Sequence, residues 1–207
     1  MLELLQKYDI MITILINRRG SMITKATGWQ KTAEMPRAAR MDSVMRAVAC
    51  WATLEEHDSV LDLFCRNSAL LGSLSKNLKL HVCGICDNPA EAPYIRRQLS
   101  DADIVYAQPF DIPWRDDAFD AVLSSKCLEY NEITPVLREA MRVLKPGGQI
   151  VLPTKLFSGK NDNSTDKKSL MCMMEQEGFE SVSWRMSGLH GVAVGWKSNR
   201  APYGECV

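Results

Sequence analysis

The segment from Asp111 to Leu152 constrains the fold more than any other part of the chain. Asp116-Asp117 mark a turn, and the apolar run from Phe119 to Ser124 that follows is suited to a buried strand. From Thr134 to Leu144, apolar residues recur at helical spacing, with charged residues between them. The order turn, strand, helix is typical of an α/β domain.

The end of this predicted helix is equally well marked. Lys145-Pro146-Gly147-Gly148 place a cation in the last turn, a residue that cannot continue the helix, and two glycines that permit positive φ. The apolar run from Gln149 to Pro153 then predicts a second strand. The segment as a whole therefore predicts a strand, a helix and a strand.

Three runs of this segment, taken together, resemble the second half of the class I S-adenosylmethionine-dependent methyltransferases. They are Asp111-Ile112-Pro113-Trp114, Phe119-Asp120-Ala121-Val122 and Arg142-Val143-Leu144-Lys145-Pro146-Gly147-Gly148. The similarity is to the methyltransferase type 11-like branch, which acts on small molecules. It implies a Rossmann-like fold, S-adenosylmethionine as cofactor, and in-line methyl transfer to a small-molecule acceptor.

The rest of the chain alternates predicted helices and strands. This alternation predicts an α/β, doubly wound, mainly parallel sheet with right-handed crossovers. The predicted strands before the opening segment are residues 59–64, 78–86 and 103–107, and the predicted helices are residues 42–56, 67–76 and 88–99.

The C-terminal part predicts an antiparallel hairpin. After a polar surface loop at 158–168 and a helix at 169–177, strand-like runs at 180–186 and 192–197 flank a Gly-containing link. They complete a seven-stranded sheet. A terminal hairpin is typical of methyltransferases and is lacking in dehydrogenase-type Rossmann sheets, and no G-x-G-x-x-G follows the first strand, which also disfavours a nicotinamide dehydrogenase.

The first 40 residues are predicted to form an N-terminal extension or cap, separate from a methyltransferase-like domain at 41–207. The apolar run from Ile10 to Ile16 is too short to span a bilayer and lacks the flanks of a signal peptide. Its β-branched residues favour an extra strand over a helix. We treat a homodimer contact through this segment as a hypothesis.

Composition excludes several classes of partner. Lys plus Arg equals Asp plus Glu at 25 each, so no overall field favours nucleic acid or an anionic membrane. Seven cysteines without a paired framework suit a reducing compartment, and we expect a cytoplasmic protein. The pair Cys83 and Cys86 is half a zinc site at most, so no metal is predicted.

The family resemblance also implies where the cofactor would bind. The first strand of the family usually ends in acid-x-Gly-x-Gly-x-Gly, where bare backbone approaches the cofactor. Here Asp62 keeps the acid, Cys65 follows, and Phe64, Arg66 and Ser68 replace the glycines, so the loop is degenerate. Arg66 could pair with the cofactor carboxylate, or it is simply a solvated surface residue.

The family's other acidic positions also differ. At the end of the second strand Cys86 stands where an acid binds the ribose, and Asp87 follows it. After the third strand Gln108 replaces an acid and precedes the apolar residues Pro109 and Phe110.

Residues after the fourth strand usually border the methyl group in this family. Here they run from Ser124 to Tyr130. Among them, Glu129 and Tyr130 are candidate catalytic residues that could assist deprotonation of an acceptor; the alternative for both is a helix-capping or packing role. The alternative interpretation of the whole chain is a non-catalytic binding or interaction protein that has lost tight cofactor binding.

Overall fold

The structure is a computed structural model that describes residues 11–16, 22–27, 43–66, 68–154, 167–187 and 190–199. The chain divides into two compact units, Met1–Arg40 and Met41–Val207. The role of the first unit as an extension or cap stays a prediction. Most of the predicted surface loop at 158–168 lies outside the described residues.

The first unit contains a hairpin. Strand β1 (Met11–Ile16) pairs antiparallel with β2 (Met22–Thr27), with Ile16 opposite Met22. The strand expected in the apolar run is confirmed. Strand β2 was not predicted from the sequence; the β-branched residues after Gly20-Ser21 favour its pairing with β1.

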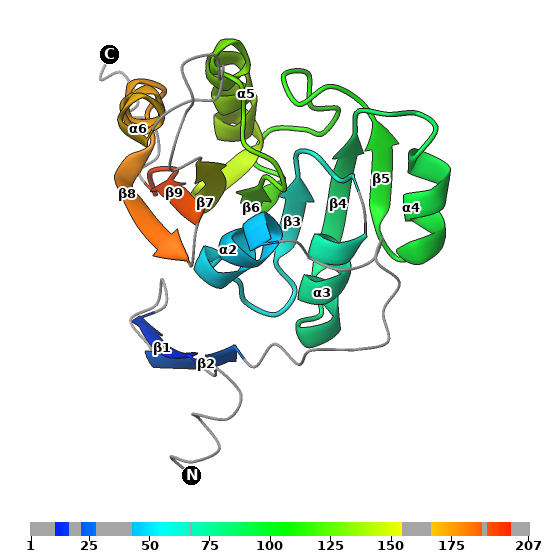
Figure 1. Cartoon of the computed structure of the whole chain (residues 1–207), viewed down its shortest axis with the longest axis horizontal. Helices are drawn as coiled ribbons and strands as arrows, with labels where there is room; N and C mark the ends of the chain where they lie inside the picture. The colour runs from blue at the N-terminus through cyan, green and yellow to red at the C-terminus, as the bar shows by residue number, and fades with distance from the viewer. Residues whose placement is uncertain are drawn as a thin grey trace, which may run out of the picture. The chain divides into compact units, whose positions relative to one another are not determined.

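The second unit is built on one seven-stranded sheet with the order β5-β4-β3-β6-β7-β9-β8 (Figure 1). The first five strands in this order run parallel, and β9 lies antiparallel to both β7 and β8. This confirms the predicted doubly wound sheet with its C-terminal hairpin. The strands are β3 (Ser59–Asp62), β4 (His81–Cys86), β5 (Asp103–Tyr106), β6 (Phe119–Leu123), β7 (Leu144–Thr154), β8 (Glu180–Ser187) and β9 (His190–Trp196).

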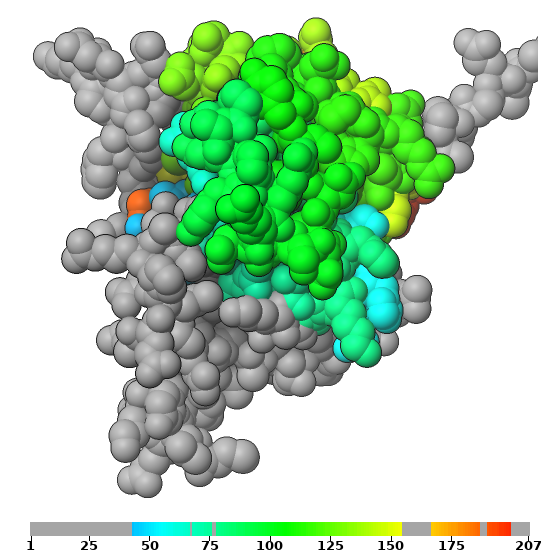
Figure 2. All heavy atoms as spheres, turned by 90° about the vertical axis from the view of Figure 1, so that its right-hand side faces the viewer, coloured from blue at the N-terminus to red at the C-terminus, as the bar shows by residue number. Residues whose placement is uncertain are grey.

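Five helices are described in this unit. α2 contacts α3, α5 contacts α6, and α4 lies along the edge strand β5. Figure 2 views the side of the molecule that carries α4 and β5, whose side chains (green) form a continuous surface. The helices are α2 (Ser43–Trp51), α3 (Ala69–Asn77), α4 (Ala92–Gln98), α5 (Tyr130–Val143) and α6 (Lys167–Gln176).

Two helix starts, those of α4 and α5, lie farthest from the predicted ones. α4 begins at Ala92 rather than at Asn88-Pro89, because the Asn88 side chain accepts the Ala90 N–H (3.0 Å) and closes a turn first. α5 begins at Tyr130 rather than at Thr134. Its start is fixed by a capping box in which Glu129 caps the helix and the Glu132 side chain accepts the Glu129 N–H.

The link between α5 and β7 is shorter than predicted. The helix ends at Val143 and the strand begins at once with Leu144, so Lys145 to Gly148 belong to the strand. The pairing of β6 with β7 shifts register between Phe119 and Ala121, which accommodates the extra residues, and Gly147 takes a φ of 74°. The predicted stop signal is therefore correct in place, and the strand resumes without a loop.

The main hydrophobic core lies between the sheet and α5. Strand residues Leu61, Ile85, Val122 and Ile150 point into it, and all are fully buried. α5 contributes a stripe at helical spacing: Ile133, Val136, Leu137, Ala140 and Val143. Because this stripe covers the central parallel strands, it fixes the carboxyl ends of those strands relative to one another.

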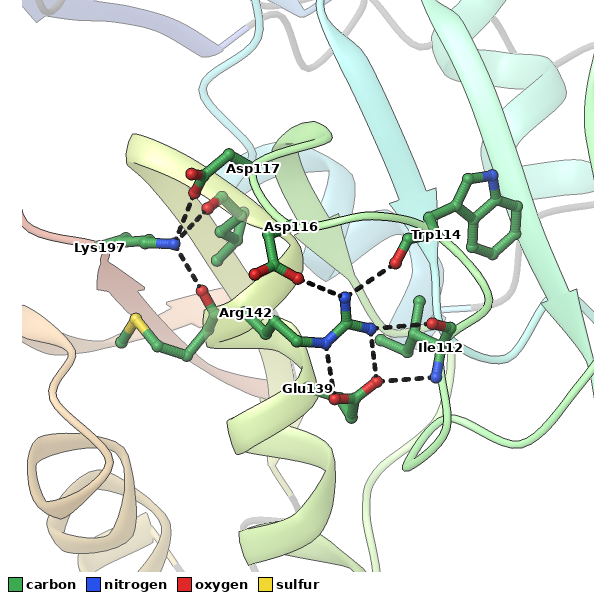
Figure 3. Close-up of polar contacts among 9 residues, drawn as sticks. Ile112, Trp114, Asp116, Asp117, Glu139, Arg142 and Lys197 are labelled. Atoms are coloured by element: carbon green, nitrogen blue, oxygen red, sulfur yellow. Dashed lines mark hydrogen bonds and ion pairs between the residues drawn. The ribbon is translucent and has the colours of Figure 1, made fainter.

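Arg142 ties the segment after β5 to α5 (Figure 3). Its guanidinium donates to the carboxylates of Glu139 (2.7 and 2.8 Å) and Asp116 (2.8 Å) and to the carbonyls of Ile112 and Trp114 (both 2.9 Å). Glu139 in turn accepts the Ile112 N–H at 2.9 Å. The pKa of Glu139 is lowered chiefly by the hydrogen bonds from Arg142.

Lys197 fixes the other end of the same segment. Its ammonium donates to Asp117 (2.8 Å) and to the carbonyls of Met141 (2.9 Å) and Leu144 (2.7 Å), as Figure 3 shows. The last two carbonyls lie at the C-terminal end of α5, where a cation is favourable. Several residues of the pattern that resembles the family, such as Arg142, therefore make contacts that hold the loop between β5 and β6 in place.

Candidate functional site

The carboxyl ends of β3, β4, β5 and β6 lie at one edge of the sheet, because these strands are neighbours and run parallel. Every predicted site residue lies at this edge or in the segment that follows a strand there. In open α/β sheets, ligands bind at this edge, at the point where the strand order reverses. Here that point lies between β3 and β6.

Asp62, the last residue of β3, is fully buried. Its Oδ1 accepts the backbone N–H groups of Phe64 (3.1 Å) and Ser125 (3.2 Å), and so joins the segments after β3 and β6. Among the described residues, Oδ2 of Asp62 has no hydrogen-bond partner. Burial raises the pKa of Asp62 to about 6, and the hydrogen bonds from Phe64 and Ser125 oppose the shift.

Phe64 takes the place of the family's first glycine, and its side chain is buried in the main core. The ammonium of Lys126, from the segment after β6, lies 4.0 Å from the centroid of the Phe64 ring. The Phe64 carbonyl also accepts a hydrogen bond from the Ser125 hydroxyl. The two segments therefore meet through a ring, a lysine and a hydroxyl.

Cys65 is buried against β4. Its N–H donates to the Ile85 carbonyl (2.7 Å), and a Cβ added at Gly84 would lie 2.8 Å from Cβ of Cys65. Burial raises the pKa of the Cys65 thiol far above its usual range, so it remains protonated. Gly84 is therefore needed for the close approach of this loop to the strand.

Arg66 points outward and reaches Asp87. The closest nitrogen–oxygen distance is 3.9 Å, with the Arg66 side chain 58% exposed and that of Asp87 29% exposed. An ion pair this open is worth about 0–1 kcal/mol. Cys86 is buried, and its Sγ lies 3.0 Å from the Asn88 carbonyl. After β4, the chain therefore presents Asp87 rather than Cys86 to the solvent.

Gln108, Pro109 and Phe110 form a tight turn after β5. The turn is closed by the hydrogen bond from the Asp111 N–H to the Gln108 carbonyl (3.0 Å). Pro109 is buried, Gln108 is exposed, and Phe110 is 50% exposed. The structure thus places an amide and an aromatic side chain on the accessible surface of this edge.

The residues after β6 divide into buried and exposed groups. Ser124 is buried and donates to the Lys126 carbonyl (2.6 Å), which shapes the turn. Glu129 is exposed and occupied as the cap of α5, whereas the Tyr130 side chain is 58% exposed. The sequence placed Ser125 and Lys126 in the segment expected to border the methyl group, directly after the fourth parallel strand, but gave neither a specific role.

A shallow groove of about 300 Å³ lies between α5 and α6, lined by Tyr130, Lys168, Ser169, Cys172, Met173 and Gln176. The described residues contain no group of three or more metal-ligating side chains. Within the described part of the chain, every helix is too short or too polar to cross a membrane.

Known proteins similar to this chain in sequence or fold include methyltransferases. A family model described as "Methyltransferase domain" matches residues 61–152. A demethylmenaquinone methyltransferase from Clavibacter sepedonicus is 47% identical over 62 residues, which are 28% of this chain and 25% of that protein. The chain thus matches only about a quarter of the length of this curated relative.

Solved structures share the fold at low identity. Geranyl diphosphate methyltransferase in complex with S-adenosylmethionine has a TM-score of 0.60 at 12% identity, covering 74% of this chain and 84% of that one. The [4+2]-cyclase SpnF has a TM-score of 0.61 at 16% identity, covering 75% and 80%.

The sheet order, the terminal hairpin and the matched segment from the first parallel strand to β7 point to one family. Residues 61–152, which are less than half of the chain, match the methyltransferase domain, and the described sheet has the fold of solved methyltransferases. Together these findings support a class I methyltransferase, a family whose cofactor is S-adenosylmethionine.

Proposed function

We propose that this protein is an S-adenosylmethionine-dependent methyltransferase that methylates a small molecule by in-line displacement. When bound, the cofactor supplies an electrophilic methyl group on a sulfonium. The protein's part in such a reaction is mainly to hold two reactants in line, and a dedicated base is optional. The carboxyl edge between β3 and β6 is the proposed site.

The observation that carries the proposal is the buried carboxylate of Asp62. Oδ2 has no partner among the described residues, although it is fully buried, and a buried polar atom without a hydrogen bond is costly. An ammonium group, such as that of the cofactor's amino acid part, would satisfy it. The raised pKa of Asp62 is consistent with a carboxylate that lacks a cationic partner.

The polar residues of the neighbouring segments suit the rest of the cofactor. Asp87 can accept the ribose hydroxyls in place of the family's acid at Cys86, and Arg66 can pair with the cofactor carboxylate. Their mutual ion pair is weak enough to open. Gln108 can accept from the adenine amino group beside Phe110. The bare backbone of the family's glycine positions, which Phe64, Arg66 and Ser68 occupy here, is not reproduced in this chain.

The acceptor would bind next to the segment after β6. Tyr130 is exposed and lines the groove toward α6, so its hydroxyl is the better candidate to touch an acceptor. Glu129 is less suited because it is already engaged as the cap of α5. We place the activity in the cytoplasm, since the six cysteines in the described part of the chain are all free thiols.

The proposal is tested by thermal unfolding of the full chain with S-adenosylhomocysteine. A ligand that binds the folded state alone must raise the midpoint. We expect a rise that saturates with concentration and that is lost in the Asp62→Ala variant. An unchanged midpoint at millimolar ligand would remove the proposed function.

A second function, binding without catalysis, is favoured by Phe64. Its buried ring and the lysine above it take the place of the family's flexible, bare backbone. The two functions differ in one measurement: incubation with S-adenosylmethionine and a mixture of small metabolites yields S-adenosylhomocysteine only if the protein is an enzyme. Ligand binding without this product would favour the second function.

A further inference from the structure

Phe64 offers a cation-binding surface at the proposed cofactor site, and a lysine occupies it. The ammonium of Lys126 lies 4.0 Å from the ring centroid. Cations are attracted to the face of an aromatic ring within about 6 Å of its centroid. The contact joins the segments after β3 and β6, between which the proposed cofactor site lies.

S-adenosylmethionine and its product S-adenosylhomocysteine differ at one atom. The sulfur of the first carries a methyl group and a positive charge, and the sulfur of the second is a neutral thioether. The segment that carries Lys126 is the one expected to border this sulfur. A lysine in this segment repels the positive charge of a sulfonium. It also covers the face of the Phe64 ring, which could otherwise attract the sulfonium. Neither effect acts on a neutral thioether.

Nearby acidic groups do not offset this charge. Asp87 and Arg66 carry opposite charges that cancel at this edge, whether or not their weak ion pair is closed, and the Glu129 side chain accepts a backbone N–H in the cap of α5. The two family acids at this edge are replaced by the uncharged Cys86 and Gln108. Asp62 remains, but we assigned its open oxygen to the ligand ammonium, which both forms of the ligand carry.

We propose that Lys126 is a specificity-determining residue that makes this site favour the neutral thioether S-adenosylhomocysteine over the sulfonium S-adenosylmethionine. The inference rests on the proposed function, because it requires that an adenosyl ligand binds at this edge.

The test is calorimetric titration of the full chain with each ligand, reported as the dissociation constant of S-adenosylmethionine divided by that of S-adenosylhomocysteine. This ratio cancels any loss of folding or of shared contacts. A unit charge several ångströms away in partly desolvated surroundings changes affinity by roughly tenfold. We therefore expect a ratio of roughly ten or more for the wild type, and a ratio reduced by about tenfold in Lys126→Gln.

Two further variants serve as matched controls. Lys126→Arg keeps the charge on the ring and should keep the ratio. Lys79→Gln removes an exposed lysine just before β4, at the opposite edge of the sheet, and should also leave the ratio unchanged. Lys126→Met gives a second uncharged variant with a side chain of similar length and should lower the ratio as Lys126→Gln does.

The outcomes separate the two proposals. A wild-type ratio at or below one, or equal ratios in the wild type and both uncharged variants, overturns the role of Lys126 and leaves the proposed function intact. Failure of every variant and of the wild type to bind either ligand overturns the proposed function and this inference together.

Discussion

At the scale of single residues, the site is organised by Asp62. Its carboxylate receives backbone N–H groups from two different segments, and without it both segments would lose a shared acceptor. This position was predictable from the sequence, because an acid at the end of the first parallel strand is part of the family pattern. The burial of Asp62 was not predictable from the sequence, because it depends on the segment after β6, where Ser125 lies 63 residues away along the chain.

Asp62 makes stability depend on pH. Its pKa is raised from 3.8 to about 6, so the folded state binds the proton more tightly than the unfolded state does. The contribution of Asp62 to the free energy of unfolding is therefore greatest below about pH 4. It falls as the pH rises from about 4 to 6, by on the order of 3 kcal/mol.

Asp62→Asn keeps an acceptor for the two N–H groups and removes the titration. We expect the free energy of unfolding of the wild type minus that of the variant to decrease between pH 4 and pH 6, measured by urea denaturation at several pH values. A constant difference across this range would show that Asp62 titrates normally.

At the scale of elements, the segment before β6 is held by Arg142. Its planar guanidinium donates to two carboxylates and two carbonyls, which a lysine cannot reproduce. We expect Arg142→Lys to lower the free energy of unfolding by roughly 1–2 kcal/mol, because the part-buried carbonyls of Ile112 and Trp114 and the carboxylate of Glu139 lose donors. Urea denaturation measures this loss.

Arg138 on the same helix is the matched control. It forms an ion pair with Glu177 at 3.0 Å, but its side chain is 69% exposed. Such a pair contributes about 0–1 kcal/mol, so Arg138→Lys should change stability little. Equal losses in the two variants would contradict the structural role assigned to Arg142.

Gly84 allows β4 and the loop after β3 to approach closely. An added Cβ would lie 2.8 Å from Cβ of Cys65 and 2.9 Å from Cδ1 of Ile104. We expect Gly84→Ala to cost about 1–3 kcal/mol of stability, as overpacking does. The measurement is again the free energy of unfolding in urea.

Gly72→Ala provides the comparison. Gly72 lies within α3, where alanine is favoured over glycine by up to about 1 kcal/mol, and its added Cβ would meet only the end of the Leu99 side chain at 3.1 Å. This variant should be neutral or slightly more stable. If Gly84→Ala were as stable as Gly72→Ala, the loop would not depend on the glycine.

Elements with strong periodic patterns were predictable, and their ends were less so. The stripe of α5 and the alternation of strands and helices follow directly from the sequence. The capping role weighed for Glu129 is confirmed, but the helix was expected only from Thr134, because the apolar stripe that predicts it is clearest from there onward. The start of α4 was missed because the side chain of Asn88 closes a turn before the helix.

At the scale of the whole molecule, the chain has two compact units, and the second contains the complete sheet. We expect residues 41–207 alone to unfold cooperatively with the far-UV circular dichroism of an α/β domain. The predicted homodimer contact through the first unit can be tested on the same fragment. Sedimentation should show a dimer for the full chain and a monomer for residues 41–207, and identical states would rule out that contact.

The fold was predictable from the sequence because its signals are repeated along the chain, in each strand, helix and turn. The site was predictable only in position. The sequence predicts which segments meet at the carboxyl edge. It does not predict the contacts of Lys126 with Phe64 and of Arg66 with Asp87, because these arise from packing between segments.

The most direct test of the account is a nuclear magnetic resonance titration of the full chain with S-adenosylhomocysteine. We expect saturable shifts in the backbone amide signals of residues 62–66, 86–88, 108–111 and 124–127, with small changes in β8 and β9. No shifts at millimolar ligand, or shifts confined to another part of the molecule, would contradict an adenosyl site at the carboxyl edge of β3 and β6.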